Sequence, residues 1–318
     1  MVDLYLFLLV QLHALPPQAD LVWSSSVRFA LVAEMAHPRY PALDRHLGAY
    51  PPIPKKSFVM PPLFAGRSAV VVDPASGAVL WQRQADIQRP IASLTKMMTA
   101  LRAYELDHTF SGEVTITAED NLPRIDNRLP VSPGETVLRA DLVSATLIAS
   151  MNNAAQALAR STSLPVDDFV VSMNEYAREL GMHDSYFTDV TGLDPQNTST
   201  VRDIARMARV VMRTPALRDR VGQENYELTT VHAQRRIFFR STNTLLSDAD
   251  IDVQGVKTGY LDEAGFTFAA WFTEGERDVL VVLLGEPTSA SRFADAKRLG
   301  RWALDDFSPG NLFTTSQK

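Results

Sequence analysis

Residues 89–101 read RPIASLTKMMTAL and place a serine at the start of a predicted helix. Apolar residues recur at helical spacing after Ser93, at Leu94, Met97, Met98 and Leu101. Positions i and i+3 share one face of a helix, so the Lys96 amine is expected beside the Ser93 hydroxyl. The first turn of a helix also presents unpaired backbone N–H groups and the positive end of the helix dipole.

This serine–lysine pair has two interpretations. A serine that caps a helix, with a lysine one turn further on, is common and requires no chemistry. Alternatively, a neutral Lys96 takes the proton of Ser93, whose oxygen then attacks a carbonyl group. An ordinary lysine with a pKa of about 10.4 is neutral only about once in 2,500 molecules at pH 7. The second interpretation therefore requires burial, or a neighbouring cation, that lowers the lysine pKa by about three units.

A second polar segment, Ser150-Met151-Asn152, separates two helical patterns. One interpretation is that it simply caps the helix that follows. In the functional interpretation, Ser150 relays a proton to a leaving amine, and Asn152 orients Lys96 and the substrate amide. The segment alone does not distinguish the two.

A third segment, Gly255-Val256-Lys257-Thr258-Gly259-Tyr260, lies on a predicted strand. Glycine in a strand often marks the close approach of a ligand or another backbone. An extended substrate is expected to pair along this strand, with Lys257 and Thr258 at its carboxylate and the Tyr260 N–H facing an oxyanion. The structural alternative is an edge strand that an inward-pointing lysine protects from aggregation.

Predicted strands flank a helix-rich middle. They cover residues 69–72, 78–81, 236–240, 253–258, 266–272 and 279–284, and a last helix carries Phe293, Leu299 and Trp302. In the middle, Gly181 is expected to end one helix, and Thr200 with Asp203 to begin another. This order predicts an α+β fold in which one sheet is assembled from both ends of the domain, with a helical region inserted between.

The chain is expected to divide into four parts. Residues 1–36 form an N-terminal apolar segment that we interpret as a signal or anchor, although no Lys or Arg precedes Arg28 and a packed terminal helix or a misassigned start remains open. Residues 37–62 hold seven prolines and predict an extended linker. Residues 63–308 form the folded domain, and residues 309–318 a tail.

Composition excludes several classes of function. The 318 residues carry a net charge of -6, which argues against nucleic-acid binding. The chain has no cysteine, and therefore no disulfide, thiolate nucleophile or Cys-ligated zinc. The six histidines form no His-Glu-x-x-His pair, and neither a Gly-x-Ser-x-Gly nucleophile elbow nor a dinucleotide-binding fingerprint occurs.

Together, the three segments resemble a known family. Ser-x-x-Lys, Ser-x-Asn and Lys-Thr-Gly in this order are the signature of penicillin-binding proteins and serine β-lactamases, and 57 residues separate the two serines. The resemblance covers roughly residues 66–304 and is to low-molecular-mass D-alanyl-D-alanine carboxypeptidases of the peptidase S11 type. It also rests on Phe187, Thr191-Gly192-Leu193, Asn197, Ser199–Asp203, Ser241–Leu246, Asp262–Gly265 and Arg292–Ala296.

The resemblance implies a fold and a reaction. The fold is the serine β-lactamase and penicillin-binding-protein type, an antiparallel sheet flanked by helices with an inserted all-helical subdomain. Ser93 would attack the bond between the last two D-alanines of a peptidoglycan stem peptide while Lys96 takes its proton. The backbone N–H groups of Ser93 and Tyr260 would form the oxyanion hole, and Ser150 would protonate the departing amine. Asn152 completes the implied catalytic set, and the implied substrate-binding residues are Lys257, Thr258, Gly259 and Tyr260.

The resemblance also implies partners and a compartment. The substrates would be stem peptides that end in D-Ala-D-Ala, and β-lactams would be covalent inhibitors. No metal or organic cofactor and no nucleic acid are implied. The active site would lie outside the cytoplasm, in the periplasm or secreted, with peripheral association to the membrane through the N-terminal segment as an open alternative.

Three rival functions remain. Only residues 303–318 follow Trp302, so we expect a single catalytic domain, a size shared with D,D-endopeptidases that cut peptidoglycan cross-links. A class A β-lactamase would need a Glu-x-x-x-Asn pattern, which is absent between Asn152 and Lys257, so slow release of β-lactams is expected. A non-catalytic sensor of β-lactams or cell wall is disfavoured because both Ser93 and Lys96 are present.

Overall fold

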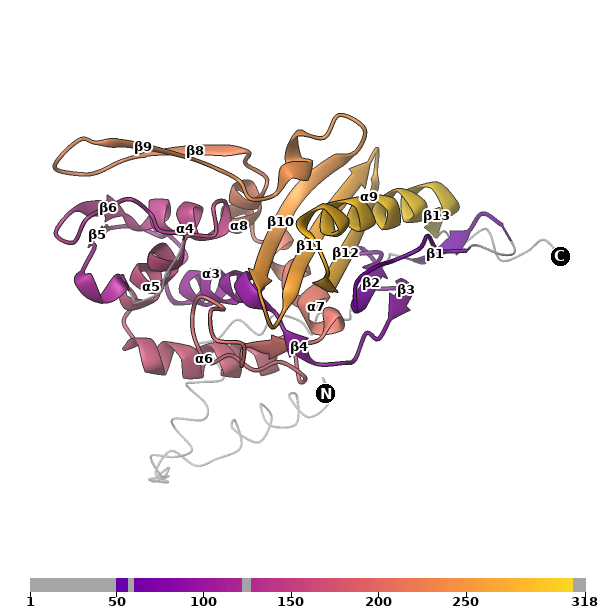
Figure 1. The fold of residues 1–318 in the computed structure, drawn as a ribbon, viewed down its shortest axis with the longest axis horizontal. Coiled ribbons are helices and arrows are strands. Elements are labelled where there is room, and N and C mark those ends of the chain that lie inside the picture. The colour runs from indigo at the N-terminus through magenta and orange to yellow at the C-terminus, as the bar shows by residue number, and fades with distance from the viewer. Residues whose placement is uncertain (1–49, 57–59, 122–126, 311–318) are drawn as a thin grey trace, which may run out of the picture. The chain divides into compact units, whose positions relative to one another are not determined.

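A five-stranded antiparallel sheet forms the centre of the fold in this computed structural model, which describes residues 50–56, 60–121 and 127–310 (Figure 1). The strand order is β10-β11-β12-β2-β3. Strands β2 (Ser68–Val72) and β3 (Val79–Arg83) form the predicted N-terminal hairpin. Strands β10 (Asp252–Leu261), β11 (Gly265–Glu274) and β12 (Arg277–Glu286) come from the other end of the domain, and β10 begins 169 positions after the end of β3. The prediction of one sheet built from both ends of the domain is confirmed.

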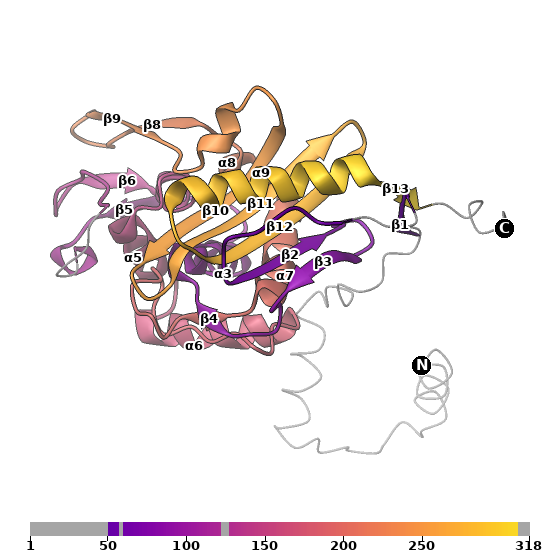
Figure 2. The same cartoon turned by 45° about the vertical axis from the view of Figure 1, so that its right-hand side comes forward.

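Helices cover both faces of this sheet. Helix α9 (Ser289–Asp306) packs on β11 and β12, and α7 (Val201–Arg213) packs on β12 and β2 (Figure 2). Burial from two sides explains why β2, with the sequence SAVVV, is buried at every residue instead of alternating. The core between the sheet and α9 is aliphatic and aromatic, with Phe268, Phe272 and Leu299 fully buried.

A helical region lies beside the sheet. It comprises α3 (Thr95–Leu106), α4 (Arg139–Leu147), α5 (Asn152–Arg160), α6 (Val166–Glu179) and α8 (Pro215–Val221), with 3₁₀ turns η1 (Ala92–Leu94), η2 (Ala118–Asp120) and η3 (Thr244–Ser247). Helix α3 contacts α4, α5, α6 and α7, so it is the central helix of this region. The predicted helix boundaries are confirmed: Gly181 has φ +75° just after α6, and the Thr200 hydroxyl accepts the Asp203 N–H at the start of α7.

Four two-stranded ladders complete the described part of the fold. They pair β1 (Tyr50–Pro54) with β13 (Phe307–Gly310), β4 (Arg89–Pro90) with β7 (Thr198–Ser199), β5 (Glu113–Thr115) with β6 (Thr136–Leu138), and β8 (Asn225–Thr229) with β9 (Arg236–Arg240). Strand β9 was expected from the sequence, but it pairs with β8 in a separate hairpin rather than joining the central sheet. Its buried and exposed residues alternate, as in a strand covered on one face only.

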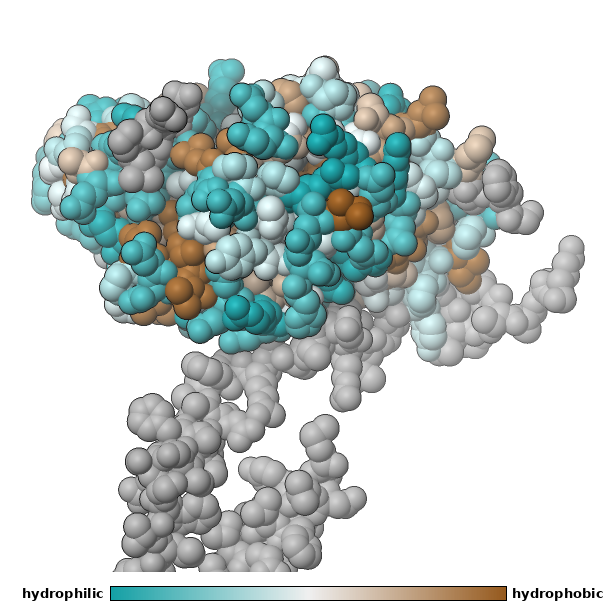
Figure 3. All heavy atoms as spheres, turned by 60° about the horizontal axis from the view of Figure 1, so that its bottom comes forward, coloured by the Kyte–Doolittle hydropathy of each residue, from teal (hydrophilic) through white to brown (hydrophobic). Residues whose placement is uncertain are grey.

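Strand β1 lies within the stretch for which the sequence predicts an extended linker. It pairs with β13, whose last two residues belong to the predicted tail, so both stretches contribute to a strand pair. The predicted signal or anchor at residues 1–36 lies outside the described residues. Among the helices in the described ranges, none combines the length and apolar character that crossing a membrane requires. The face shown in Figure 3 is largely hydrophilic, with apolar residues in scattered patches.

Candidate active site

Ser93 lies in η1, between the end of β4 and the start of α3, and is half-buried. Its neighbour Ala92 has φ +49°, a left-handed backbone that residues other than glycine rarely adopt. Such strain persists only where surrounding contacts enforce it, and it is concentrated at functional sites. One enforcing contact comes from Gly192, where an added Cβ would lie 2.0 Å from the Ala92 carbonyl oxygen. Gly192 itself has φ +81°, so both the space and the backbone require glycine there.

Lys96 lies one turn after Ser93 and is fully buried. Its Nζ is 2.9 Å from Ser93 Oγ, 2.7 Å from Asn152 Oδ1 and 2.6 Å from the Thr191 carbonyl oxygen. Burial lowers the pKa of Lys96 from 10.5 to about 7, against the weaker opposing effect of the Asp189 charge. The lysine is therefore both aligned with the serine and partly neutral near pH 7, as the functional interpretation of the serine–lysine pair requires.

The loop between α6 and α7 supplies the Thr191 carbonyl, and Asp189 organises it. The Asp189 carboxylate accepts the backbone N–H groups of Thr191, Gly192 and Asp194 at 2.5–2.7 Å. Asp189 also contributes the negative charge that favours the protonated form of Lys96. Sequence reasoning assigned no role to this aspartate. Its signal was local, since an aspartate shortly before Thr-Gly is typical of a turn that the carboxylate closes.

Ser150 and Asn152 occupy the junction between α4 and α5. Ser150 has φ +62°, a second left-handed residue at one of the three motifs. Asn127 holds the junction, because its side-chain amide donates to the carbonyls of Ala149 and Ser150, and its own carbonyl accepts the Asn152 N–H at 3.0 Å. Sequence analysis did not single out Asn127. Ser150 is 7% exposed, and none of the hydrogen bonds between the described residues involves its hydroxyl.

The third motif lies on β10, at one edge of the central sheet. An added Cβ at Gly259 would lie 2.9 Å from the Ser93 backbone nitrogen, so the strand passes directly against the start of η1. Lys257 is 1% exposed, and its Nζ donates to the Thr258 carbonyl at 2.9 Å. The Thr258 hydroxyl lies 2.6 Å from that of Thr242. Glycine at position 259 thus permits the close backbone approach that the motif predicted.

Tyr260, the last residue of the motif, has an exposed side chain, whereas Lys257 and Thr258 are buried. Its side chain is 51% exposed, and its hydroxyl donates to Asp262 at 2.6 Å. Only its backbone can take part in the oxyanion hole that the resemblance implies.

Three buried basic side chains, those of Lys96, Lys257 and Arg292, lie in this region. Burial lowers the pKa of Lys257 well below 10.5, and the charges of Lys96 and Arg292 lower it further. Arg292, on α9, donates to the Gly259 carbonyl at 3.0 Å. Burial lowers the Arg292 pKa to about 10, although Glu286 acts in the opposite direction. An anionic ligand group or a developing oxyanion in this dry site would favour the protonated forms of these side chains.

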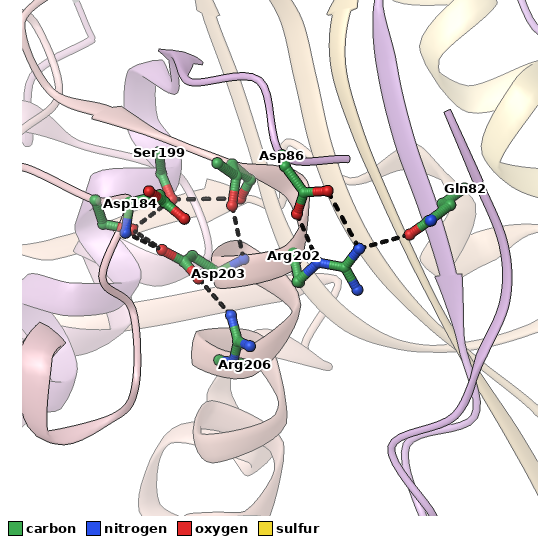
Figure 4. A network of polar contacts seen from close by, with 9 residues as sticks. Gln82, Asp86, Asp184, Ser199, Arg202, Asp203 and Arg206 are labelled. Carbon is green, nitrogen blue, oxygen red and sulfur yellow. Dashed lines mark hydrogen bonds and ion pairs between the residues drawn. The ribbon is translucent and has the colours of Figure 1, made fainter. Parts of the chain in front are cut away.

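A polar network around α7 anchors the two segments that lead into the site (Figure 4). The Asp203 carboxylate accepts the Asp184 N–H and the Ser185 hydroxyl, both at 2.9 Å, and pairs with Arg206. Ser185 also bonds Ser199 in β7, and β7 pairs with the β4 strand that precedes Ser93. The network therefore fixes both ends of the loop that carries Thr191.

The structure brings most of the predicted residues together. Ser93, Lys96 and Asn152 form one hydrogen-bonded group, and Gly259 packs against Ser93. Lys257 is close enough to Lys96 for their charges to interact, although its Nζ donates to the carbonyl of Thr258 on its own strand.

Comparisons with known proteins agree with this geometry. Residues 55–288 match the family described as D-alanyl-D-alanine carboxypeptidase, peptidase S11. The chain is 32% identical to a D-alanyl-D-alanine endopeptidase of Pseudomonas aeruginosa, over 80% of this chain and 82% of that protein. It is 30% identical to the D-alanyl-D-alanine carboxypeptidase DacA of Escherichia coli K12, over 79% of this chain but only 63% of that protein.

Solved structures give the same result. The DD-transpeptidase of Streptomyces K15 superposes with a TM-score of 0.73 at 26% identity, covering 77% of this chain and 99% of that one. A D-alanyl-D-alanine carboxypeptidase of Mycobacterium tuberculosis superposes with a TM-score of 0.73 at 25% identity, covering 81% and 99%. The predicted fold class is confirmed, and the chain belongs to the D-alanyl-D-alanine carboxypeptidase family, peptidase S11.

Proposed function

We propose that this chain is a serine-type D-alanyl-D-alanine carboxypeptidase that acts on peptidoglycan stem peptides through an acyl-enzyme on Ser93. One observation carries the proposal: a fully buried lysine, with its pKa lowered to about 7, lies 2.9 Å from the hydroxyl of a serine at a helix start. Neither a structural cap nor a surface lysine needs that burial, and general-base chemistry does.

Acylation begins with the neutral form of Lys96. A neutral amine has two N–H donors and one lone pair. Its donors fit the Asn152 and Thr191 oxygens, which leaves the lone pair directed at the Ser93 hydroxyl. As the Ser93 oxygen bonds to the carbonyl carbon of the penultimate D-alanine, its proton passes to Lys96. The backbone N–H groups of Ser93 and Tyr260 would stabilise the oxyanion.

Collapse of this intermediate expels terminal D-alanine. The C–N bond breaks, and the leaving nitrogen takes the proton that Lys96 received from Ser93, relayed through the Ser150 hydroxyl with Lys257 beside it, so that Lys96 is neutral again. The open edge of β10 would align the extended peptide as an added strand. The positive charges of Lys257 and Arg292 would attract its terminal carboxylate, with Thr258 as a hydrogen-bond partner.

Deacylation repeats the proton transfers with water as the nucleophile. Lys96 accepts a proton from water, the hydroxide oxygen attacks the ester, and Ser93 recovers its proton as it leaves. A penicillin would acylate Ser93 in the same way but release slowly, since the sequence has no Glu-x-x-x-Asn pattern for a deacylating glutamate.

A second candidate is a D,D-endopeptidase that cuts cross-links between stem peptides. One observation favours it: the chain spans 82% and 78% of two endopeptidases that it resembles, of Pseudomonas aeruginosa and Escherichia coli, but 63% of DacA. Both reactions use the same acyl-enzyme and differ in the leaving amine.

Location follows from the substrate. Because peptidoglycan lies outside the cytoplasm, we propose that the enzyme works there, in the periplasm or secreted. Tethering by residues 1–36 remains a prediction about a segment outside the described residues.

The test is to incubate the purified chain with a defined muropeptide mixture and separate the products by chromatography and mass. Loss of terminal D-alanine from monomeric pentapeptides is expected for a carboxypeptidase, and conversion of cross-linked dimers to monomers for an endopeptidase. Ser93→Ala should abolish either reaction. The hydrolase proposal fails if neither product forms while Ser93 still takes up penicillin covalently, and a sensor would then remain.

A further inference from the structure

A buried glutamate lies outside the three motifs. Glu286 is the last residue of β12, opposite Phe266 on β11, and is 0% exposed. Both of its carboxyl oxygens are buried and make no hydrogen bond of normal geometry to a described residue. Buried carboxyl groups ordinarily have partners, because an unpaired buried charge is strongly destabilising. This carboxyl group therefore needs an explanation.

Gly66 leaves space for the Glu286 side chain. An added Cβ at Gly66 would lie 2.6 Å from the Glu286 carboxyl oxygen, so any other residue there would displace it. Burial raises the pKa of Glu286 to about 7, the Ser291 hydroxyl opposes the rise, and the nearby Asp295 carboxyl group adds to it. Asp295 is 1% exposed and accepts the Ala65 N–H at 2.7 Å. A negative charge this close to a buried carboxyl group favours the protonated form of Glu286.

Arg292 connects the two acids to the active-site strand. Its guanidinium donates to the Gly259 carbonyl at 3.0 Å and to the Ser289 hydroxyl at 3.1 Å, and it lies over the Phe266 ring. Its charge interacts with Glu286 on one side and with Lys257 on the other. A change in the charge of Glu286 thus reaches the backbone and the lysine of the Lys-Thr-Gly segment through one side chain.

The surroundings identify the charges that compete with this effect. From α9, Arg292 and Asp295 interact with the glutamate, and Arg298 forms an ion pair with Asp295. The hollow beside Glu286 is also lined by Arg67 before β2 and by Asp262 and Glu263 in the β10–β11 turn. Those three are exposed, and water therefore screens them, whereas Arg292 is buried.

We propose that Glu286 is a positioning residue for the reaction: it gains or loses a proton beside the Asp295 carboxylate and, through Arg292, sets the charge and the hold of the Lys-Thr-Gly strand on an anionic substrate. The proposal rests on the proposed function. Ionised Glu286 offsets part of the Arg292 charge, which lets Lys257 keep its proton and attract the substrate carboxylate. When Glu286 is protonated, the Arg292 charge is uncompensated and the protonated form of Lys257 is less favoured.

The experiment measures acylation of the full chain by a fluorescent penicillin, which carries a carboxylate, across pH. The acylation of wild type is divided by that of Glu286→Gln at each pH. This ratio cancels the effect of the Lys96 titration, which both proteins share. We expect a ratio near 1 at about pH 5.5, where glutamate and glutamine are both neutral. It should rise to about fivefold at about pH 8.5. The difference between the two proteins should appear in the dissociation constant of the non-covalent penicillin complex. The rate constant of the acylation step should be similar in both.

Asp141→Asn is the matched control. Asp141 is another buried carboxyl group whose pKa burial raises, and it lies on α4 with the Tyr226 hydroxyl as its partner. The ratio of acylation by wild type to acylation by Asp141→Asn should not change with pH. A Glu286→Gln ratio that is constant at every pH would show a merely structural glutamate and overturn the proposal. An unacylated wild type would overturn the proposed function itself, so the two failures are distinct.

Asp295→Asn keeps the test decisive if Glu286→Gln does not fold. Without the Asp295 charge, Glu286 should lose its proton at lower pH. Acylation by Asp295→Asn should therefore exceed that of wild type at about pH 6 and converge with it at about pH 8.5. A ratio that does not change with pH would show that the protonation of Glu286 does not affect acylation, and would overturn the proposal.

Discussion

The Lys96 and Glu286 regions contain oppositely charged groups that burial brings to nearly the same pKa. Burial lowers the Lys96 pKa from 10.5 and raises the Glu286 pKa from 4.5, each to about 7. A low-dielectric interior disfavours the charged form whichever sign it has. The two regions differ in hydrogen bonding, since Lys96 has three partners, whereas Glu286 has none of normal geometry among the described residues.

That difference separates two uses of a buried titratable group. Lys96 is held in place in either protonation state, so it can pass a proton to and from Ser93 without moving. Glu286 has no such frame, and its protonation changes the electrostatic environment of Arg292 instead. Strand β10 is connected to both regions, since Gly259 packs on Ser93 and accepts a hydrogen bond from Arg292.

The largest expected effect comes from replacing Lys96, the base in the proposed reaction. Lys96→Arg keeps a cation in place but cannot lose its proton in a protein. The rate of acylation by penicillin should fall by about a thousandfold or more, and raising the pH should not restore it. Stopped-flow fluorescence with a labelled penicillin measures this rate. Recovery of the rate at high pH would show that Lys96 is not the base.

Gly192→Ala should disturb the frame around Lys96 without touching its charge. The new Cβ would collide with the Ala92 carbonyl, and φ is +81°. We expect the free energy of unfolding to fall by about 3 kcal/mol and acylation to fall with it.

Gly275→Ala is the matched control for that substitution. Gly275 also has a left-handed backbone, with φ +60°, but an added Cβ meets nothing within 4 Å. Its loss should be only about 1 kcal/mol, from the backbone alone. Equal losses in denaturant unfolding of the two variants would refute the close packing of Gly192 on Ala92.

A smaller expected effect concerns Glu286 and the dependence of the free energy of unfolding on pH. A carboxyl group with a raised pKa holds its proton in the folded state when the unfolded chain has lost it. Glu286 therefore contributes stability below pH 4.5 that is lost as the pH rises through about 7. Glu286→Gln lacks this loss, so relative to wild type it should gain about 1–3 kcal/mol between pH 5 and pH 8.

Lys96 provides the opposite slope for comparison. Its lowered pKa contributes stability above pH 10.5 that is lost as the pH falls through about 7. Urea unfolding of Glu286→Gln and wild type across both windows distinguishes the two groups. A stability difference that stays constant between pH 5 and pH 8 would mean that Glu286 does not titrate there.

Much of the fold and part of the site could be predicted from the sequence. The hairpin at residues 69–81, the three C-terminal strands and the helix starting after Thr200 are local patterns of period two or 3.6, and the structure contains each. The Ser93–Lys96 contact was predictable because both residues lie on one turn of a helix. The interpretation of residues 50–54 as linker differs from the structure, since a proline-rich segment can still form an edge strand when a partner, here β13, lies beside it.

The sequence by itself determined which groups are available, in what order, and to which family the chain is similar. Tertiary structure alone decided which of them meet. Asn127, Gly192 and Glu286 gained their roles from contacts with residues far away in the chain. Tertiary structure also decided the charges of Lys96 and Glu286, because the pKa of each group depends on the removal of water around it. Local patterns predict contacts within one helix or hairpin, but burial arises only when separate elements pack together.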